Sequence, residues 1–145
     1  MSEQPKIKNL WGDLSLGETI RTPYIILKEQ ASILTEATNG LLIAEVRKEQ
    51  KIAKIKSEYD FNCVLDIKVP AINNYSISVV TIKYPVTIYP AKIYRYIQNS
   101  VEGKVCKNEE ELEENLEAIL SSQEVRRIVS GLLSEVRADK TVQEA

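Results

Sequence analysis

The residue types that carry most acid–base and metal chemistry are scarce in this chain of 145 residues. It has no histidine, so the commonest general base and the commonest metal ligand are both missing. Its two cysteines, Cys63 and Cys106, lie far apart in the sequence without a CxxC pairing. A structural zinc site usually needs four Cys or His ligands. We therefore expect no zinc site and no histidine-activated nucleophile.

Carboxylates are the remaining candidates for metal or acid–base chemistry. Asp60 and Asp66 fall on one face of a predicted strand, six residues and about 20 Å apart, which is too far to share one ion. Residues from other strands could complete a site around either of them. A metal-dependent hydrolase is therefore a further alternative, although a solvated sheet face explains both aspartates more simply.

The sequence motifs of common enzymes are also missing. The five glycines are scattered, so neither GxxxxGK[ST] nor GxGxxG occurs, and no GxSxG or SxxK motif is present. The sequence therefore predicts no catalytic residue, no bound metal and no cofactor, and favours a protein without catalytic activity.

Aromatic and basic residues gather in the second half of the chain, where residues 67–101 hold four basic residues and no acidic one. Such a mixture is typical of protein interfaces, and it is also found where single-stranded nucleic acid binds. A sequence pI near 5.4 favours a protein partner, and RNA binding is the alternative. Trp11 is expected either to pack onto the body or to anchor a partner. The predicted partner-binding residues are Trp11, Lys83, Tyr84, Tyr89, Lys92, Tyr94, Arg95 and Tyr96.

The first element that would position these residues is a helix over about residues 23–38. Thr22-Pro23 is a helix start, an apolar stripe follows at three- and four-residue spacing, and Asn39-Gly40 is a helix end. The stripe consists of Ile26, Leu27, Gln30, Ala31, Ile33, Leu34 and Ala37.

Strands follow the helix. We expect a short strand over 41–47, a basic loop over 47–56, and a strand over 59–69 whose apolar and polar residues alternate. A further strand spans 75–84. Pro85 and Pro90 bracket residues 86–89, which are expected to form an edge strand, and residues 91–107 fit either a helical turn or a short strand.

The C-terminal part is predicted to be helical and acidic, since residues 102–145 hold six basic and eleven acidic residues. Asn108 with Glu111 and Ser121 with Glu124 both match a capping box, which favours two helices. The excess of glutamate in the first of them is either a solvated face or a surface for a basic partner.

Together these elements predict an α+β fold: a two-layer sandwich with an N-terminal helix, a three- to four-stranded antiparallel meander and two C-terminal helices. Residues 1–20 would form an extended arm, 21–137 a single domain and 138–145 a frayed tail. Without an export signal or a long apolar run, we expect a cytoplasmic protein that does not enter a membrane. We expect it to act as a regulatory or protein-binding module through a sheet edge and a charged surface, as a homodimer or with another protein.

Overall fold

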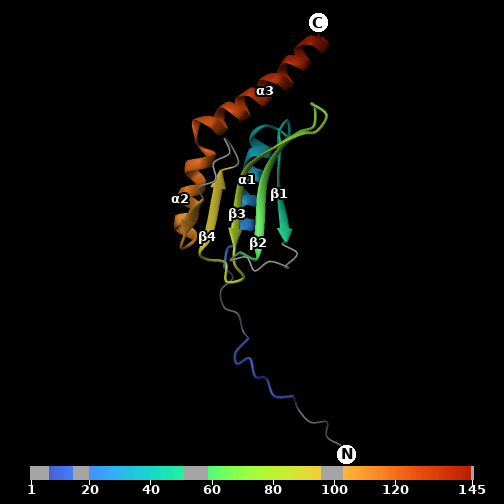
Figure 1. The fold of residues 1–145 in the computed structure, drawn as a ribbon. Coiled ribbons are helices and arrows are strands. Elements are labelled where there is room, and N and C mark those ends of the chain that lie inside the picture. Colours follow the sequence, from blue (N-terminus) through green and yellow to red (C-terminus); the bar gives the residue numbers. More distant parts are fainter. Residues whose placement is uncertain (1–6, 15–19, 51–58, 96–102, 145) are drawn as a thin grey trace, which may run out of the picture.

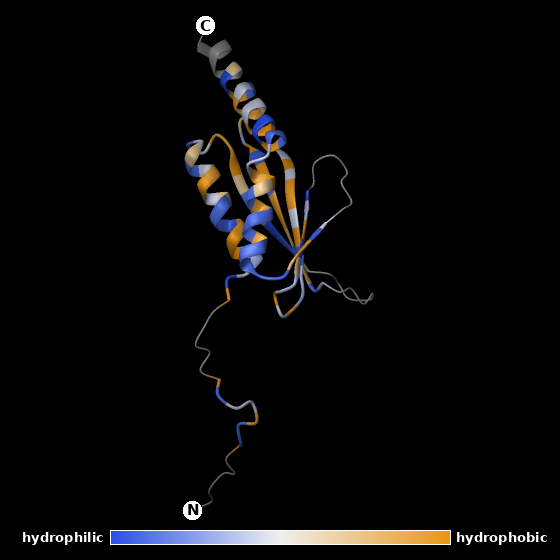
Figure 2. Ribbon diagram, turned by 90° about the vertical axis from the view of Figure 1, so that its left-hand side faces the viewer, coloured by the Kyte–Doolittle hydropathy of each residue, from blue (hydrophilic) through white to orange (hydrophobic). Residues whose placement is uncertain are grey.

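The computed structural model describes residues 7–14, 20–50, 59–95 and 103–144. Five strands form one antiparallel sheet in sequence order, and the helices of the described chain lie on one side of it (Figures 1 and 2). The predicted α+β architecture is confirmed, with five strands in place of three or four. The elements in chain order are α1 (Pro23–Ala37), β1 (Ile43–Gln50), β2 (Phe61–Val69), β3 (Tyr75–Tyr84), β4 (Ala91–Arg95), β5 (Lys104–Cys106), α2 (Glu109–Leu120) and α3 (Gln123–Glu144).

The ends of α1 follow the sequence signals closely. The Thr22 hydroxyl accepts the N–H of Ile25 at 3.2 Å, and Pro23 is the first helical residue. At the other end, Asn39 and Gly40 adopt φ angles of 51° and 78°, the left-handed conformation that ends a helix. The predicted helix is therefore confirmed almost to the residue.

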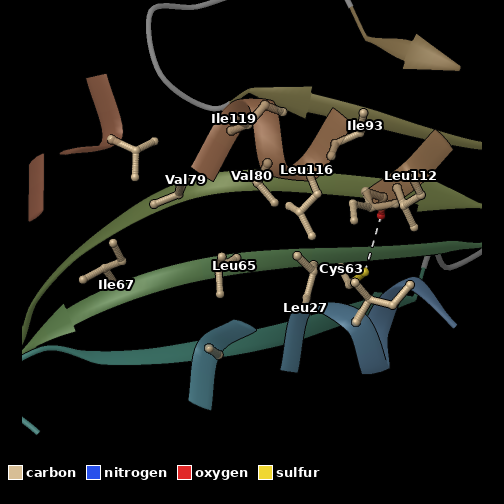
Figure 3. Packing of buried hydrophobic residues seen from close by; sticks show 14 of the residues in the cluster. Leu27, Cys63, Leu65, Ile67, Val79, Val80, Ile93, Leu112, Leu116 and Ile119 are labelled. Atoms are coloured by element: carbon tan, nitrogen blue, oxygen red, sulfur yellow. Dashed lines mark hydrogen bonds between the residues drawn. The ribbon is translucent and has the colours of Figure 1, made fainter. Parts of the chain in front are cut away.

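The hydrophobic core lies between the sheet and the helices (Figure 3). The alternation in β2 places Cys63, Leu65 and Ile67 on this side, as predicted, opposite Leu27 of α1 and Leu116 of α2. The pairing of β2 with β3 shifts register between Leu65 and Asp66, which is a β-bulge.

Two of the predicted strand boundaries are wrong. β1 continues to Gln50, because the charged residues after Arg47 still pair with β2: Lys48 lies opposite Cys63 and Glu49 opposite Asn62. Charged side chains suit an edge strand. Residues 51–56 of the expected loop lie outside the described residues.

The expected edge strand at 86–89 is a turn between β3 and β4. The N–H of Ile88 donates to the carbonyl of Pro85 at 2.9 Å, and the Asp60 carboxylate accepts the N–H of Val86 at 3.0 Å. Two prolines so close together remove the donors that a sheet ladder needs, so the chain turns here. The Tyr89–Pro90 peptide bond is cis. The undecided segment 91–107 supplies β4 and β5.

The C-terminal helices are confirmed, with one change at their junction. The side chain of Asn108 accepts the N–H of Glu111 at 2.9 Å, as the capping motif predicts. The cap of α3 is Ser122 rather than Ser121, because the Ser122 hydroxyl accepts the N–H of Val125 at 3.3 Å. α3 continues to Glu144 through the region expected to fray. Within the described ranges, no helix is long and apolar enough to cross a membrane.

Candidate functional site

The face of the sheet opposite the helices is not covered by any helix of the described chain (Figure 2). Side chains alternate along each strand, and the strand register brings the outward ones into rows. In one row, Arg47 lies opposite Val64, Val64 opposite Thr81, and Thr81 opposite Tyr94. We call this surface the open face; its residues are Glu45, Arg47, Glu49, Asn62, Val64, Asp66, Lys68, Ser78, Thr81, Lys83, Lys92 and Tyr94.

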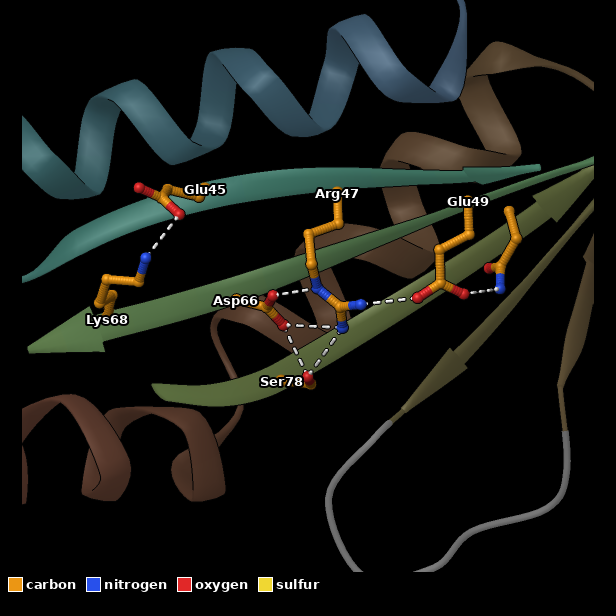
Figure 4. Close-up of polar contacts among 7 residues, drawn as sticks. Glu45, Arg47, Glu49, Asp66, Lys68 and Ser78 are labelled. Carbon is orange, nitrogen blue, oxygen red and sulfur yellow. Dashed lines mark hydrogen bonds and ion pairs between the residues drawn. The ribbon is translucent and has the colours of Figure 1, made fainter. Parts of the chain in front are cut away.

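A network of charged and polar side chains crosses β1, β2 and β3 on the open face (Figure 4). At its centre Asp66, which is almost fully buried, forms an ion pair with Arg47 and accepts the hydroxyl of Ser78 at 2.6 Å. Arg47 also contacts Glu49 at 2.6 Å, and Glu49 in turn accepts the amide of Asn62 at 3.2 Å. The hydrogen bond that Arg47 donates to Asp66 is the main cause of the raised pKa of Arg47.

The contacts of Asp66 in this network bear on whether it could bind a metal ion. Its oxygens are engaged by a guanidinium and a hydroxyl, and the positive charge of Arg47 opposes a cation at the same place. Asp60 lies elsewhere, where it caps the turn at Val86. In the part of the chain that is described, no three Asp, Glu, Cys or His residues are grouped as a metal site would require. The arrangement thus favours a structural role for both aspartates.

A second feature of the open face is a cluster of Lys83, Lys92 and Tyr94, which we call the basic cluster. The ammonium nitrogens of Lys83 and Lys92 lie 5.2 and 5.5 Å from the centroid of the Tyr94 ring, within range of a cation–π interaction. The backbone of Gly103 packs against the same ring, since a Cβ there would lie 2.6 Å from Cε1 of Tyr94. The cluster therefore places two positive charges around a ring that is already packed.

The structure does not bring the other predicted site residues to this cluster. Tyr84 is buried on the helical side of the sheet, and Tyr89 is partly buried with its hydroxyl inside; burial raises the pKa of each to about 12. Arg95 reaches toward Glu124 of α3, with 3.8 Å between Nη1 and Oε2. Tyr96 lies outside the described residues.

Trp11 lies in the segment before α1 and is 84% exposed. Of the two expectations, packing onto the body is therefore wrong, and the side chain is available to a partner. Its neighbours explain the exposure, because Asn9 and Gly12 hold a tight local turn whose hydrogen bonds involve no residue of the body.

The two edges of the sheet are β1 and β5 rather than the segment around Val86. At the β1 edge, the hydroxyl of Thr35 in α1 accepts the N–H of Ala44 at 3.0 Å. Farther along, Arg47, Lys48 and Glu49 put charges on this strand, and both features discourage the addition of another strand. The β1 edge is therefore poorly suited to pairing with a strand of a partner.

Sequence reasoning missed the partners of Asp66. Arg47 and Ser78 belong to strands whose register with β2 is set by long-range pairing, and Arg47 falls where the expected strand 41–47 meets the expected loop 47–56. The alternation of charge in Glu45, Arg47 and Glu49 was the available signal, since it has the two-residue period of a strand.

Comparison with known proteins adds no relative: no family model matches the chain, and neither the curated proteins nor the solved structures contain a match. The function must therefore be argued from the open face and its surroundings.

Proposed function

We propose that this protein is a non-catalytic binding module that docks the acidic surface of another protein on the open face of its sheet. The basic cluster carries the proposal, because Lys83 and Lys92 converge on Tyr94 in a part of the sheet that no described helix covers. Charged patches of this kind raise association rates and select partners of opposite charge.

The polar network beside the cluster supports the same function. Arg47, Asp66 and Ser78 hold one another in fixed positions across three strands, so the surface is ordered before a partner arrives. An ordered surface loses less side-chain entropy on binding than a flexible one. Val64 and Thr81 are buried in the middle of the open face, which gives it a packed floor beneath its charged side chains.

Single-stranded nucleic acid is the alternative ligand, and the two lysines would suit its phosphates. Base stacking needs an accessible aromatic ring. Gly103 packs against Tyr94, and Tyr84 lies in the core, so the rings of the predicted site are poorly placed for stacking. This geometry favours a protein partner.

The test is affinity capture from native extract with the full chain and two double variants. Lys83→Glu with Lys92→Glu reverses the basic cluster. Lys107→Glu with Arg127→Glu makes the same change of charge at exposed positions outside the open face. We expect the wild type and the second variant to retain the same proteins, and the first variant to lose them.

Nuclease treatment of the extract separates the two ligands. Retention of the captured proteins after treatment supports direct protein docking, whereas their loss would assign the surface to nucleic acid. If the cluster variant captures the same proteins as the wild type in equal amounts, the open face is not the docking surface and the proposal fails. Circular dichroism of each variant verifies that the fold is retained.

A further inference from the structure

Four large apolar side chains near the N-terminus are exposed. Ile7, Leu10, Trp11 and Leu14 are between 56% and 97% exposed, although each is of a type that usually prefers the interior. We call residues 7–14 the apolar arm. Exposed apolar groups gathered in one short segment are typical of a binding element.

The arm has a preformed local structure around its tryptophan. The side chain of Asn9 accepts the N–H of Trp11 and donates to the carbonyl of Gly12, both at 2.9 Å. Gly12 has a φ of 80°, which a residue with a side chain adopts only with strain. The turn fixes the backbone around Leu10 and Trp11, so the arm loses less conformational entropy when it binds.

The same chain carries an apolar groove that none of the described residues covers. Between α1 and the α2–α3 corner there is a hollow of about 210 Å³, lined mainly by apolar side chains of both walls and of the sheet beneath them. An apolar cavity of about 150 Å³ is large enough for benzene, so this hollow has room for a larger ring. Its walls include Ile33 and Leu34 of α1 and Val125 and Val129 of α3, above Leu65 of β2.

The exposure of Ile33 indicates that the groove is only partly filled. It belongs to the apolar stripe of α1 and lines the hollow, yet it is 57% exposed. A neighbouring hollow of about 590 Å³ continues along the groove between α1 and α2 and shares Gln30 and Leu120 with the first. Glu113 and Glu117 line this second hollow together with Arg21 and Arg126, and Arg21 is paired with Glu113 at 2.9 Å, so the charges along it are largely balanced.

The arm of a single molecule does not fill the groove of the same molecule, because its apolar side chains are exposed. Arg21, just before α1, is held by Glu29 of α1 and by Glu109 and Glu113 of α2, and it lines the second hollow. Two copies related by a two-fold axis could each place an arm in the groove of the other. That exchange would cover the apolar arm and the groove of both copies.

We infer that the groove between α1 and α3 receives the apolar arm of a second copy of this chain, with the Trp11 side chain seated against Ile33, Val125 and Val129. The inference is independent of the open face, which lies on the other side of the sheet. The site selects an aromatic side chain flanked by aliphatic ones, as Trp11 is by Leu10 and Leu14.

Trp11 is the single tryptophan of the sequence, so its fluorescence reports on the site directly. Emission, acrylamide quenching and light-scattering mass are measured on the full chain over a wide range of concentration. As the mass rises from one chain to two, we expect emission to move to shorter wavelength and quenching to weaken in step. A single-chain mass with solvent-exposed tryptophan at every concentration would overturn the inference.

Variants separate exchange between copies from insertion of each arm into its own groove. We expect Trp11→Ala and Ile33→Glu each to prevent the dimer, whereas Val86→Glu, which changes an equally exposed apolar residue in the β3–β4 turn, leaves it intact. A mixture of the Trp11→Ala and Ile33→Glu chains contains one intact arm and one intact groove. It should therefore form a heterodimer with blue-shifted emission. Blue-shifted emission from single chains would instead place each arm in its own groove and contradict the inference.

Discussion

Tyr84 is a polar side chain in an apolar setting. It is 1% exposed, its ring lies 5.5 Å from that of Phe61, and its hydroxyl oxygen has no hydrogen-bond partner among the described residues. Burial raises its pKa to about 12, and the nearby Cys63 and Tyr24 act in the same direction. An unsatisfied buried hydroxyl costs stability that a phenyl ring would not.

We predict that Tyr84→Phe is neutral or stabilising at pH 7, by up to about 1 kcal/mol. The variant should also lose less stability in alkali. The unfolded chain ionises a tyrosine near pH 10, whereas the native state keeps the proton up to a pKa of about 12. The unfolded state thus binds fewer protons in this window, so stability falls as pH rises through it.

Urea unfolding at pH 7 and about pH 11 tests this prediction, with Tyr75→Phe as the control at a tyrosine about half exposed. The wild type and the control should lose stability similarly in alkali, and Tyr84→Phe should lose on the order of 1–2 kcal/mol less. A Tyr84→Phe variant that is clearly destabilised at pH 7 would mean that the hydroxyl has a partner after all.

The residues of the open face show how much of the candidate site could be predicted from the sequence. The outward face of β2 followed from two-residue alternation, so the position of the half-buried Asn62 and Lys68 on the polar side was predictable. The nearly complete burial of Asp66 was not, because it depends on Arg47 and Ser78 arriving from neighbouring strands. Local patterns carry no information on that register.

At the scale of elements, two threonines join α1 to the start of β1. The Thr38 hydroxyl accepts the N–H of Leu42 at 3.2 Å and lies within hydrogen-bond distance of the carbonyls of Leu34 and Leu42. Thr35 makes the matching contact to Ala44. These bonds fix the turn by which the chain leaves the helix and enters the edge strand.

Replacing Thr38 with valine keeps the shape and removes the oxygen. Leu42 is fully buried, so its N–H would lose its partner without gaining access to water. We expect Thr38→Val to cost about 1–3 kcal/mol of unfolding free energy, and Thr38→Ser, which keeps the hydroxyl, to cost less. Urea unfolding and amide exchange at Leu42 measure both effects. Equal stability of the two variants would show that the hydroxyl is not needed.

The helices and strands were predictable where a capping residue or a two-residue period marked them, as at Thr22, Asn108 and β2. Prediction failed at Lys48 and Glu49, where charged residues were assigned to a loop, and between Pro85 and Pro90, where β-branched residues resemble a strand. In both cases tertiary context decided. An edge strand accepts charge, and a pair of prolines stops pairing whatever lies between them.

At the scale of the whole molecule, the two faces of the sheet differ: one packs against the helices, and the other is the face that we propose for binding. The helices seal one face into a core that includes Val136 of α3, while the other presents the network around Asp66 and the basic cluster. Consecutive short connections made the antiparallel order of the sheet predictable. The groove beside Ile33 was not predictable, because the stripe of α1 does not show which of its members the other helices leave uncovered.

The whole molecule divides into an arm and a domain that should fold without it. The core begins at α1, with no described residue of the arm in it, so removal of residues 1–20 should leave the domain folded. At low protein concentration we expect the truncated and full chains to unfold cooperatively with free energies within about 0.5 kcal/mol of each other. Loss of cooperative unfolding on truncation would instead make the arm part of the fold.

Protein concentration then separates the two chains. If copies exchange arms, association stabilises the full chain, so its urea midpoint rises as concentration increases, whereas the midpoint of the truncated chain stays constant. A full-length chain carrying Trp11→Ala should behave like the truncated one, because it keeps the length of the arm and loses its main anchor. A midpoint that rises equally in all three chains would place the self-association surface in the domain itself, away from the apolar arm.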